Sequence, residues 1–307
     1  MARALALLSL LMLLACGDDG RRPARDAGGG GADTGPGTDA GPGVDAGPRP
    51  DTGITPGGCT EMARWIYLVD SDDELLRYEP DTDTLTTIGT LACPGSSSPF
   101  SMSVDRNATA WVLHQDHRIY QVSTADASCS ESPFVPDQMG FELFGMGFVA
   151  DAAGSASETL FISGGPESGI GLGSSTLGRI DVASWTVSSV GSVGGSPGLT
   201  GTGEGELWGF FPDATPMSVQ QLDKGSAAAL RTIDVSEIEG GFGFGASAWA
   251  FAFWGGRFYI FYQGTLDDST GIYRVTPDTG AVETVRENIG YRIVGAGVST
   301  CAPTELI

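Results

Sequence analysis

Four acidic residues of this chain end or follow short glycine-rich stretches and could act as acid–base pairs. They are Asp105, Asp151, Glu204 and Glu206. Two carboxyl groups about 5–10 Å apart can hydrolyse a glycosidic bond, one as general acid and the other as base or nucleophile. Asp105, Asp151 and Glu206 are the catalytic candidates of an alternative, enzymatic interpretation. The preferred interpretation assigns no catalytic residue and is structural, because Asp105–Ala108 has the composition of a hairpin turn whose Asp accepts backbone N–H groups.

Other catalytic motifs are scarce. The two histidines, His114 and His117, could bind a metal ion together with Asp116, but polar residues are equally expected at a strand end and turn. A Ser-His-Asp triad would need one of the same two histidines. Gly194–Gly198 matches G-x-S-x-G, yet it has a proline after the serine and no helix behind it, as a nucleophile elbow requires. The sequence therefore favours a protein with no metal, no cofactor and no enzymatic activity.

The charge balance excludes one class of partner. The 307 residues include 38 Asp and Glu against 16 Lys and Arg, which gives a formal net charge of −22. Such a surface repels a phosphate backbone, so we expect no nucleic-acid partner.

The N-terminus has the features of an export signal. Residues 1–15 contain one positive side chain, Arg3, and an apolar run from Leu5 to Leu14 that is too short to span a bilayer. The end of this segment, Leu13-Leu14-Ala15-Cys16, resembles the lipobox of bacterial lipoproteins. The resemblance implies cleavage before Cys16, lipidation of Cys16 and a membrane anchor. The alternative is an ordinary signal peptide with a chance cysteine.

Residues 16–58 are predicted to be a disordered tether. Positions 17–58 contain 14 Gly and 6 Pro, no aromatic residue, and Val44 and Ile54 as the large aliphatic residues. Such a segment cannot bury enough apolar surface to offset its ordering entropy.

In lipoproteins, Asp after the lipidated cysteine favours the inner membrane. Gly17 stands at that position here, so the resemblance implies the outer membrane of a Gram-negative bacterium.

Four cysteines follow the lipobox: Cys59, Cys93, Cys129 and Cys301. An even number of cysteines in an exported chain predicts two disulfides, with three connectivities open. No C-x-x-C spacing supports a zinc site.

The elements that position these residues form a repeat. The strand–turn–strand pattern at 75–89 recurs at 179–191 and 274–285, with a diverged copy at 219–233. Each hairpin is preceded by a bulky strand, and each bulky strand after the first by a small glycine-rich one. The small strands recur every ~42 to ~55 residues, close to the period of propeller blades. They are Phe100–Asp105, Phe144–Val149, Leu199–Gly203, Phe251–Trp254 and Ile293–Val298.

The two ends of the domain complement each other. The first bulky strand, Trp65–Val69, has no small strand before it, and the last small strand, Ile293–Ser299, has no bulky strand after it. Joining them completes a first blade. The chain thereby resembles β-propellers over residues 59–307, and we expect an all-β, five-bladed propeller. Six or seven blades is the alternative. This closure predicts a Cys59–Cys301 disulfide and leaves Cys93–Cys129 as the second pair.

Two functions follow as expectations. The preferred one is a cell-envelope lipoprotein that displays the propeller as a binding or scaffolding module for an extracellular or periplasmic protein or glycan. The alternative is a membrane-tethered glycoside hydrolase or lyase, because five-bladed glycosidases place paired acids in the central channel.

Overall fold

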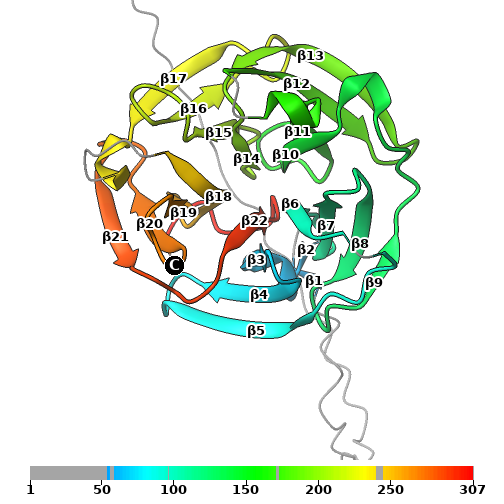
Figure 1. Ribbon diagram of the computed structural model, residues 1–307, viewed down its shortest axis with the longest axis horizontal. Coiled ribbons are helices and arrows are strands. Elements are labelled where there is room, and N and C mark those ends of the chain that lie inside the picture. Colours follow the sequence, from blue (N-terminus) through cyan, green and yellow to red (C-terminus); the bar gives the residue numbers. More distant parts are fainter. Residues whose placement is uncertain (1–53, 56–58, 96, 171–172, 240–244, 307) are drawn as a thin grey trace, which may run out of the picture. The chain divides into compact units, whose positions relative to one another are not determined.

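The computed structural model describes residues 54–55, 59–95, 97–170, 173–239 and 245–306. Within these ranges the chain forms five four-stranded antiparallel sheets arranged as blades around a central axis (Figure 1). The predicted all-β, five-bladed propeller is confirmed, and the alternative of six or seven blades is not. The predicted signal peptide, Cys16 and most of the predicted tether lie outside the described residues.

The strands of each blade follow one another in the chain from the innermost to the outermost, except that the C-terminal β22 supplies the innermost strand of the first blade. The first blade contains β22 (Ile293–Val298), β3 (Ile66–Asp70), β4 (Glu74–Glu79) and β5 (Thr84–Thr90). The second contains β6 (Pro99–Val104), β7 (Thr109–His114), β8 (Ile119–Ser123) and β9 (Cys129–Glu131). The third contains β10 (Leu143–Ala150), β11 (Glu158–Gly165), β12 (Ser174–Asp181) and β13 (Thr186–Gly194). The fourth contains β14 (Gly198–Gly201), β15 (Leu207–Phe211), β16 (Ser218–Leu222) and β17 (Ala229–Asp234). The fifth contains β18 (Ala246–Trp254), β19 (Arg257–Gly264), β20 (Gly271–Val275) and β21 (Val282–Arg286).

Short elements complete the described chain. The strands β1 (Ile54–Thr55) and β2 (Cys59–Thr60) pair with each other. The helices are single 3₁₀ turns: η1 (Glu61–Arg64), η2 (Gln138–Gly140), η3 (Glu167–Gly169) and η4 (Ser236–Glu239). Among the residues described, no helix is long and apolar enough to cross a membrane.

The ring closes through the C-terminal strand. β22 pairs antiparallel with β3, with Val298 opposite Ile66 and Ala296 opposite Leu68. A disulfide between Cys59 and Cys301 joins the residues just outside this pair, and Cys93–Cys129 forms the second bridge. These are the two pairs that the closure predicts. Because such bridges persist in oxidising compartments, they place the domain outside the cytoplasm.

The bulky second strand of each blade is buried on both faces. In β3, Ile66 and Leu68 pack toward the fifth blade, against residues such as Tyr259. Tyr67 and Val69 point to the opposite face and pack toward the second blade. Successive side chains of a strand point to opposite faces, so a strand between two blades is apolar at most positions. This explains why these strands appear as continuous hydrophobic runs.

Glycine in the innermost strands lets neighbouring blades approach closely. A Cβ at Gly145 would lie 2.5 Å from the carbonyl oxygen of Pro197, and one at Gly147 would lie 3.0 Å from the Cα of Thr200. Real Cβ atoms are not found at the shorter of these distances. The small residues predicted near the axis are therefore required by the spacing between blades.

The outer hairpin has one turn geometry in every blade. Asp83, Trp185 and Gly280 occupy the same position of the sequence repeat, and all three have positive φ. Ala127 and Ala227 have positive φ in the remaining two blades. In four of the five turns, the N–H of this residue donates to the carbonyl four residues earlier. The acidic turn at 80–83 therefore belongs to the scaffold rather than to a recognition loop.

Candidate functional site

The innermost strands give the central axis two different mouths. Ser101 donates to the carbonyl of Phe144, and Ser103 accepts from the N–H of Phe148, so β6 and β10 run in the same direction. The other inner strands run in the same direction. For example, Gly145 and Gly147 of β10 face Pro197 and Thr200 in the same order along the chain. We call the end where these strands begin the N-terminal mouth, and the end where they finish the C-terminal mouth.

A pocket of about 320 Å³ lies at the N-terminal mouth. All five innermost strands contribute to its wall, which places it on the axis. The residues that carry its chemistry are Phe100, Gln115, Ile170, Trp249, Arg292 and Val294. Its volume is at the lower end of the range for pockets that bind small ligands. The pocket can therefore enclose one ring or one side chain of a ligand.

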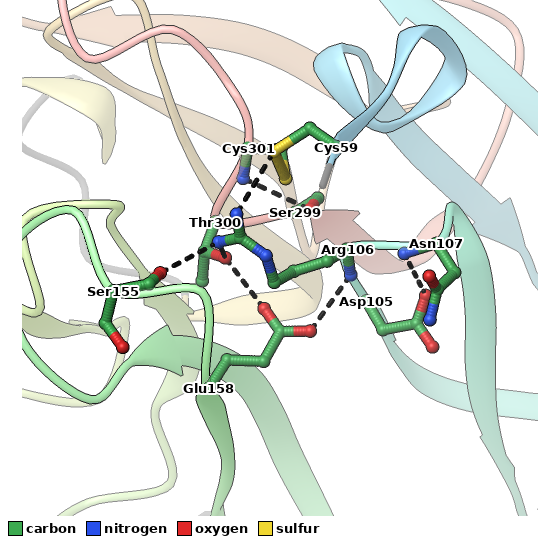
Figure 2. Close-up of a disulfide and its surroundings, with 9 residues drawn as sticks. All are labelled: Cys59, Asp105, Arg106, Asn107, Ser155, Glu158, Ser299, Thr300 and Cys301. Carbon is green, nitrogen blue, oxygen red and sulfur yellow. Dashed lines mark hydrogen bonds between the residues drawn. A yellow bond between two sulfur atoms is a disulfide. The ribbon is translucent and has the colours of Figure 1, made fainter. Parts of the chain in front are cut away.

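The C-terminal mouth contains a half-buried polar cluster beside the closing disulfide (Figure 2). The carboxylate of Glu158 accepts the backbone N–H of Arg106 at 2.9 Å and the hydroxyl of Thr300 at 2.7 Å. The Arg106 guanidinium donates to the carbonyl of Ser155, to Thr300 Oγ1 and to Cys59 Sγ. The cluster thus connects the first three blades at the point where the ring closes.

Burial raises the pKa of Glu158 to about 7, although hydrogen bonds from Thr300 and Arg106 oppose the shift. The folded protein therefore holds this proton more tightly than the unfolded chain, whose glutamate has a pKa of 4.5. Unfolding releases the proton between these values, so stability falls as pH rises from ~4.5 to ~7.

We expect Glu158→Gln to remove this pH dependence. The wild type should lose about 2.5 kcal/mol through Glu158 between pH 5 and pH 8, and the variant should not. Urea unfolding of both proteins at the two pH values measures how much unfolding free energy each loses. Subtracting the two losses cancels the contributions of the other carboxyl groups. Glu204→Gln, an exposed residue near the same mouth, is the control. An unchanged pH profile in Glu158→Gln would contradict the assignment.

The three predicted catalytic carboxylates lie at turns around the C-terminal mouth. Asp105 accepts the N–H groups of Asn107 and Thr109 at 2.9 Å and the Trp111 indole at 3.1 Å, and burial raises its pKa. The turn geometry expected for Asp105–Ala108 is present. Both of its oxygens accept hydrogen bonds within its own blade.

Asp151 and Glu206 have separate partners. Asp151 accepts the Thr159 hydroxyl at 2.7 Å, and hydrogen bonds from Ser157 and Thr159 lower its pKa. Glu206 accepts the indole N–H of Trp208 at 3.0 Å. Neither residue shares a described partner with the other or with Asp105, and none of the three lines the pocket.

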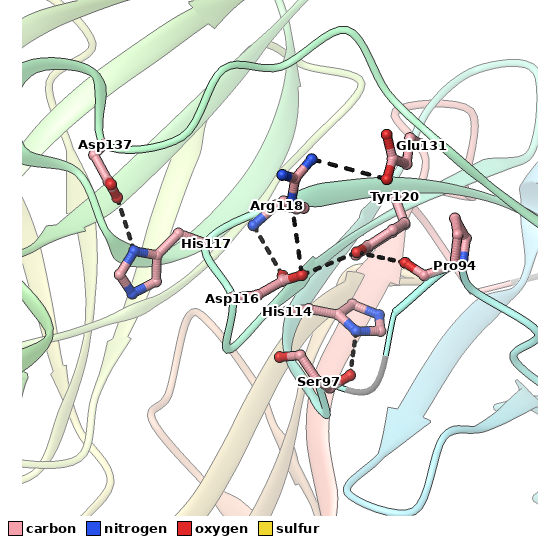
Figure 3. Close-up of polar contacts among 9 residues, drawn as sticks. All are labelled: Pro94, Ser97, His114, Asp116, His117, Arg118, Tyr120, Glu131 and Asp137. Atoms are coloured by element: carbon pink, nitrogen blue, oxygen red, sulfur yellow. Dashed lines mark hydrogen bonds and ion pairs between the residues drawn. The ribbon is translucent and has the colours of Figure 1, made fainter.

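The predicted metal candidates do not converge (Figure 3). His114 is buried, and its Nδ1 donates to the carbonyl of Ser97 at 2.6 Å. His117 contacts the carboxylate of Asp137 at 2.7 Å. Asp116 instead lies 3.0 Å from the Tyr120 hydroxyl. Within the described part of the chain, no group of three or more His, Cys, Asp or Glu side chains could hold a metal ion.

Two residues of these mouths were not predicted from the sequence. Glu158 begins a bulky strand, and Arg292 directly precedes the last small strand. A usable signal existed for Arg292, because the chain has 16 basic residues and this one stands at the start of an innermost strand. The lipidation residue Cys16 lies outside the described residues.

Comparisons with known proteins give no family for this chain. No protein-family profile matches it, and no curated protein matches it. Among the solved structures that are similar in part, three illustrate the likeness. A chain of a nidogen/laminin complex has a TM-score of 0.44 and 13% identity, covering 76% of this chain and 80% of that chain. TolB from Acinetobacter baumannii has a TM-score of 0.44 and 10% identity, covering 73% of this chain and 52% of that chain.

The third is a chain of a mitotic checkpoint complex, with a TM-score of 0.36 and 14% identity. It covers 71% of this chain and 59% of that chain. Likenesses this distant carry no argument about function, and the fold assignment rests on the strand pairing itself.

Proposed function

We propose that this protein is a cell-envelope lipoprotein that presents a five-bladed β-propeller as a binding or scaffolding module for a protein or glycan. The observation that supports binding most directly is the pocket at the N-terminal mouth, to which all five blades contribute. A rigid ring of blades is a suitable base for such a site, because each wall residue is fixed by its own sheet.

The anchor is proposed from the sequence at the N-terminus. Residues 1–15 form a signal peptide, Cys16 carries the lipid, residues 16–58 form the tether, and residues 59–307 form the propeller domain. As a flexible coil, the tether would have ends about 35 Å apart, which separates the domain from the lipid surface. Gly17 after the lipidated cysteine supports the outer membrane.

We expect Cys16→Ser to release the protein from the membrane, because lipidation of this sulfur is the proposed attachment. Cell fractionation with immunodetection measures the share of protein in the outer-membrane fraction. Gly17→Ala is the matched control and should stay membrane-bound. A Cys16→Ser protein that still sediments with membranes would show that the anchor is wrong.

The binding function is tested separately with the purified full chain. Association with a panel of envelope polysaccharides and envelope proteins, measured by surface plasmon resonance, is the expected result. Association with no member of the panel would contradict the module.

A further inference from the structure

The N-terminal mouth has one cationic group and no anionic one among its described lining residues. Arg292 is exposed at the start of β22 and reaches across to β18. Its guanidinium donates through one terminal nitrogen to Ser247 Oγ at 3.2 Å and through the other to the carbonyl of Ser247. The side chain therefore bridges the fifth and first blades at the rim of the pocket.

This charge has no carboxylate partner in the described part of the chain, where the ion pairs involve other residues. A guanidinium has five N–H donors in a planar fork. The two contacts with Ser247 leave further donors for a ligand. A planar fork of this kind matches a carboxylate well.

The rest of the wall is mainly apolar. Phe100, Ile170, Trp249 and Val294 are half-buried there, so each presents part of its side chain to the pocket. Trp249 also keeps an indole N–H that donates to no described group. Burying an apolar group of a ligand against this wall is favourable in proportion to the area removed from water.

Three hydroxyl groups of the wall are already bonded within the protein. Ser101 donates to the carbonyl of Phe144, Ser163 pairs with Ser175, and Ser247 bonds the carbonyls of Gln263 and Gly264. A sugar ring needs many polar partners to replace the water lost from its hydroxyl groups. These serines offer few, so apart from Arg292 and the Gln115 amide the pocket suits the apolar remainder of a ligand with one charged group.

Resting on the proposed binding function, we infer that this pocket binds an apolar organic carboxylate. The acid group bonds Arg292, and a ring or branched chain packs against Trp249 and Phe100. The same chemistry is carried by a free aromatic acid and by the C-terminal residue of a peptide.

The first test compares an acid with its own amide on the unmodified full chain. Isothermal titration calorimetry should show 3-phenylpropionate binding at least about tenfold more tightly than 3-phenylpropionamide, because the amide cannot accept a charge-assisted pair of hydrogen bonds. Equal affinities, or no binding of either compound, would overturn the inference. This comparison needs no variant, so a folding defect cannot affect it.

Variants then locate the effect. Arg292→Gln should abolish the preference for the acid, and Arg292→Lys should retain part of it. Arg179→Gln is the matched control, because Arg179 is also exposed and donates to a serine hydroxyl, that of Ser188, but does not line the pocket. An equal loss in Arg179→Gln would overturn the assignment to Arg292.

The source of the carboxylate is distinguished by a third probe. N-acetyl-phenylalanine represents the end of a peptide chain, and its affinity relative to 3-phenylpropionate identifies which source the pocket prefers. Failure of the acid–amide comparison removes the ligand class alone. A Cys16→Ser protein that stays membrane-bound, or a panel in which no member binds, contradicts the proposed function and leaves acid binding intact.

Discussion

Replacing Cys59 and Cys301 together by serine is expected to lower the free energy of unfolding by about 5 kcal/mol, the largest effect of any change considered for this protein. The bridge spans a sequence separation of 242 residues, and the chain-entropy estimate grows with the length of the closed loop. The bond also holds the end of β22 beside the start of the domain. Urea unfolding under oxidising conditions measures the loss.

The matched control is the double replacement of Cys93 and Cys129, whose separation is 36 residues. It should cost less, about 4 kcal/mol in the same estimate. The two double variants should differ more clearly in which strands are destabilised than in how much stability is lost. Hydrogen exchange should speed up in the amides of β22 and β3 in the Cys59/Cys301 variant alone. Equal exchange of β22 in both double variants would show that the bridge does not hold the ring closed.

The second large effect is expected at two adjacent glycines of β11 that differ in their surroundings. A Cβ at Gly164 would lie 2.1 Å from the carbonyl oxygen of Leu143 and 2.5 Å from the Cβ of Phe144, whereas one at Gly165 would meet nothing within 4 Å. Gly164→Ala must therefore displace the backbone of β10. We expect a loss of about 3 kcal/mol, at the upper end of overpacking effects.

Thermal unfolding measures this difference directly. For a domain of this size, that loss lowers the Tm by roughly 6 °C. Gly165→Ala should leave the Tm close to that of the wild type. Equal shifts in the two variants would mean that the close approach of β10 and β11 does not require glycine.

The architecture was predictable because each blade repeats the same physical demands. Small residues recur where inner strands meet, and apolar runs such as Ile66–Val69 recur where a strand is covered on both faces. The positive φ shared by Asp83, Trp185 and Gly280 shows why the outer turns align although their charges differ. Ring closure was predictable because Trp65–Val69 has no small strand before it and Ile293–Ser299 has no bulky strand after it.

The candidate sites were less predictable, because they depend on which side chains meet across blades. The sequence indicates that Asp105 follows an inner strand, but not that its oxygens are taken up by Asn107, Thr109 and Trp111. Likewise, no sequence pattern joins Glu158 to Thr300, which lie 142 residues apart. Contacts of this kind arise from the curvature of the ring, and the repeat spacing does not contain them.

The pairing of β22 with β3 has a consequence for synthesis of the chain. β3 is the first strand of the ring to be made, and its inner partner is the last. Until residue 298 is available, the inner edge of β3 has unpaired backbone groups that could bind another strand. Contacts between the two ends of a chain also form slowly. A chain that stops early therefore cannot complete its first blade, and the protein reaches its final stability only when translation is complete.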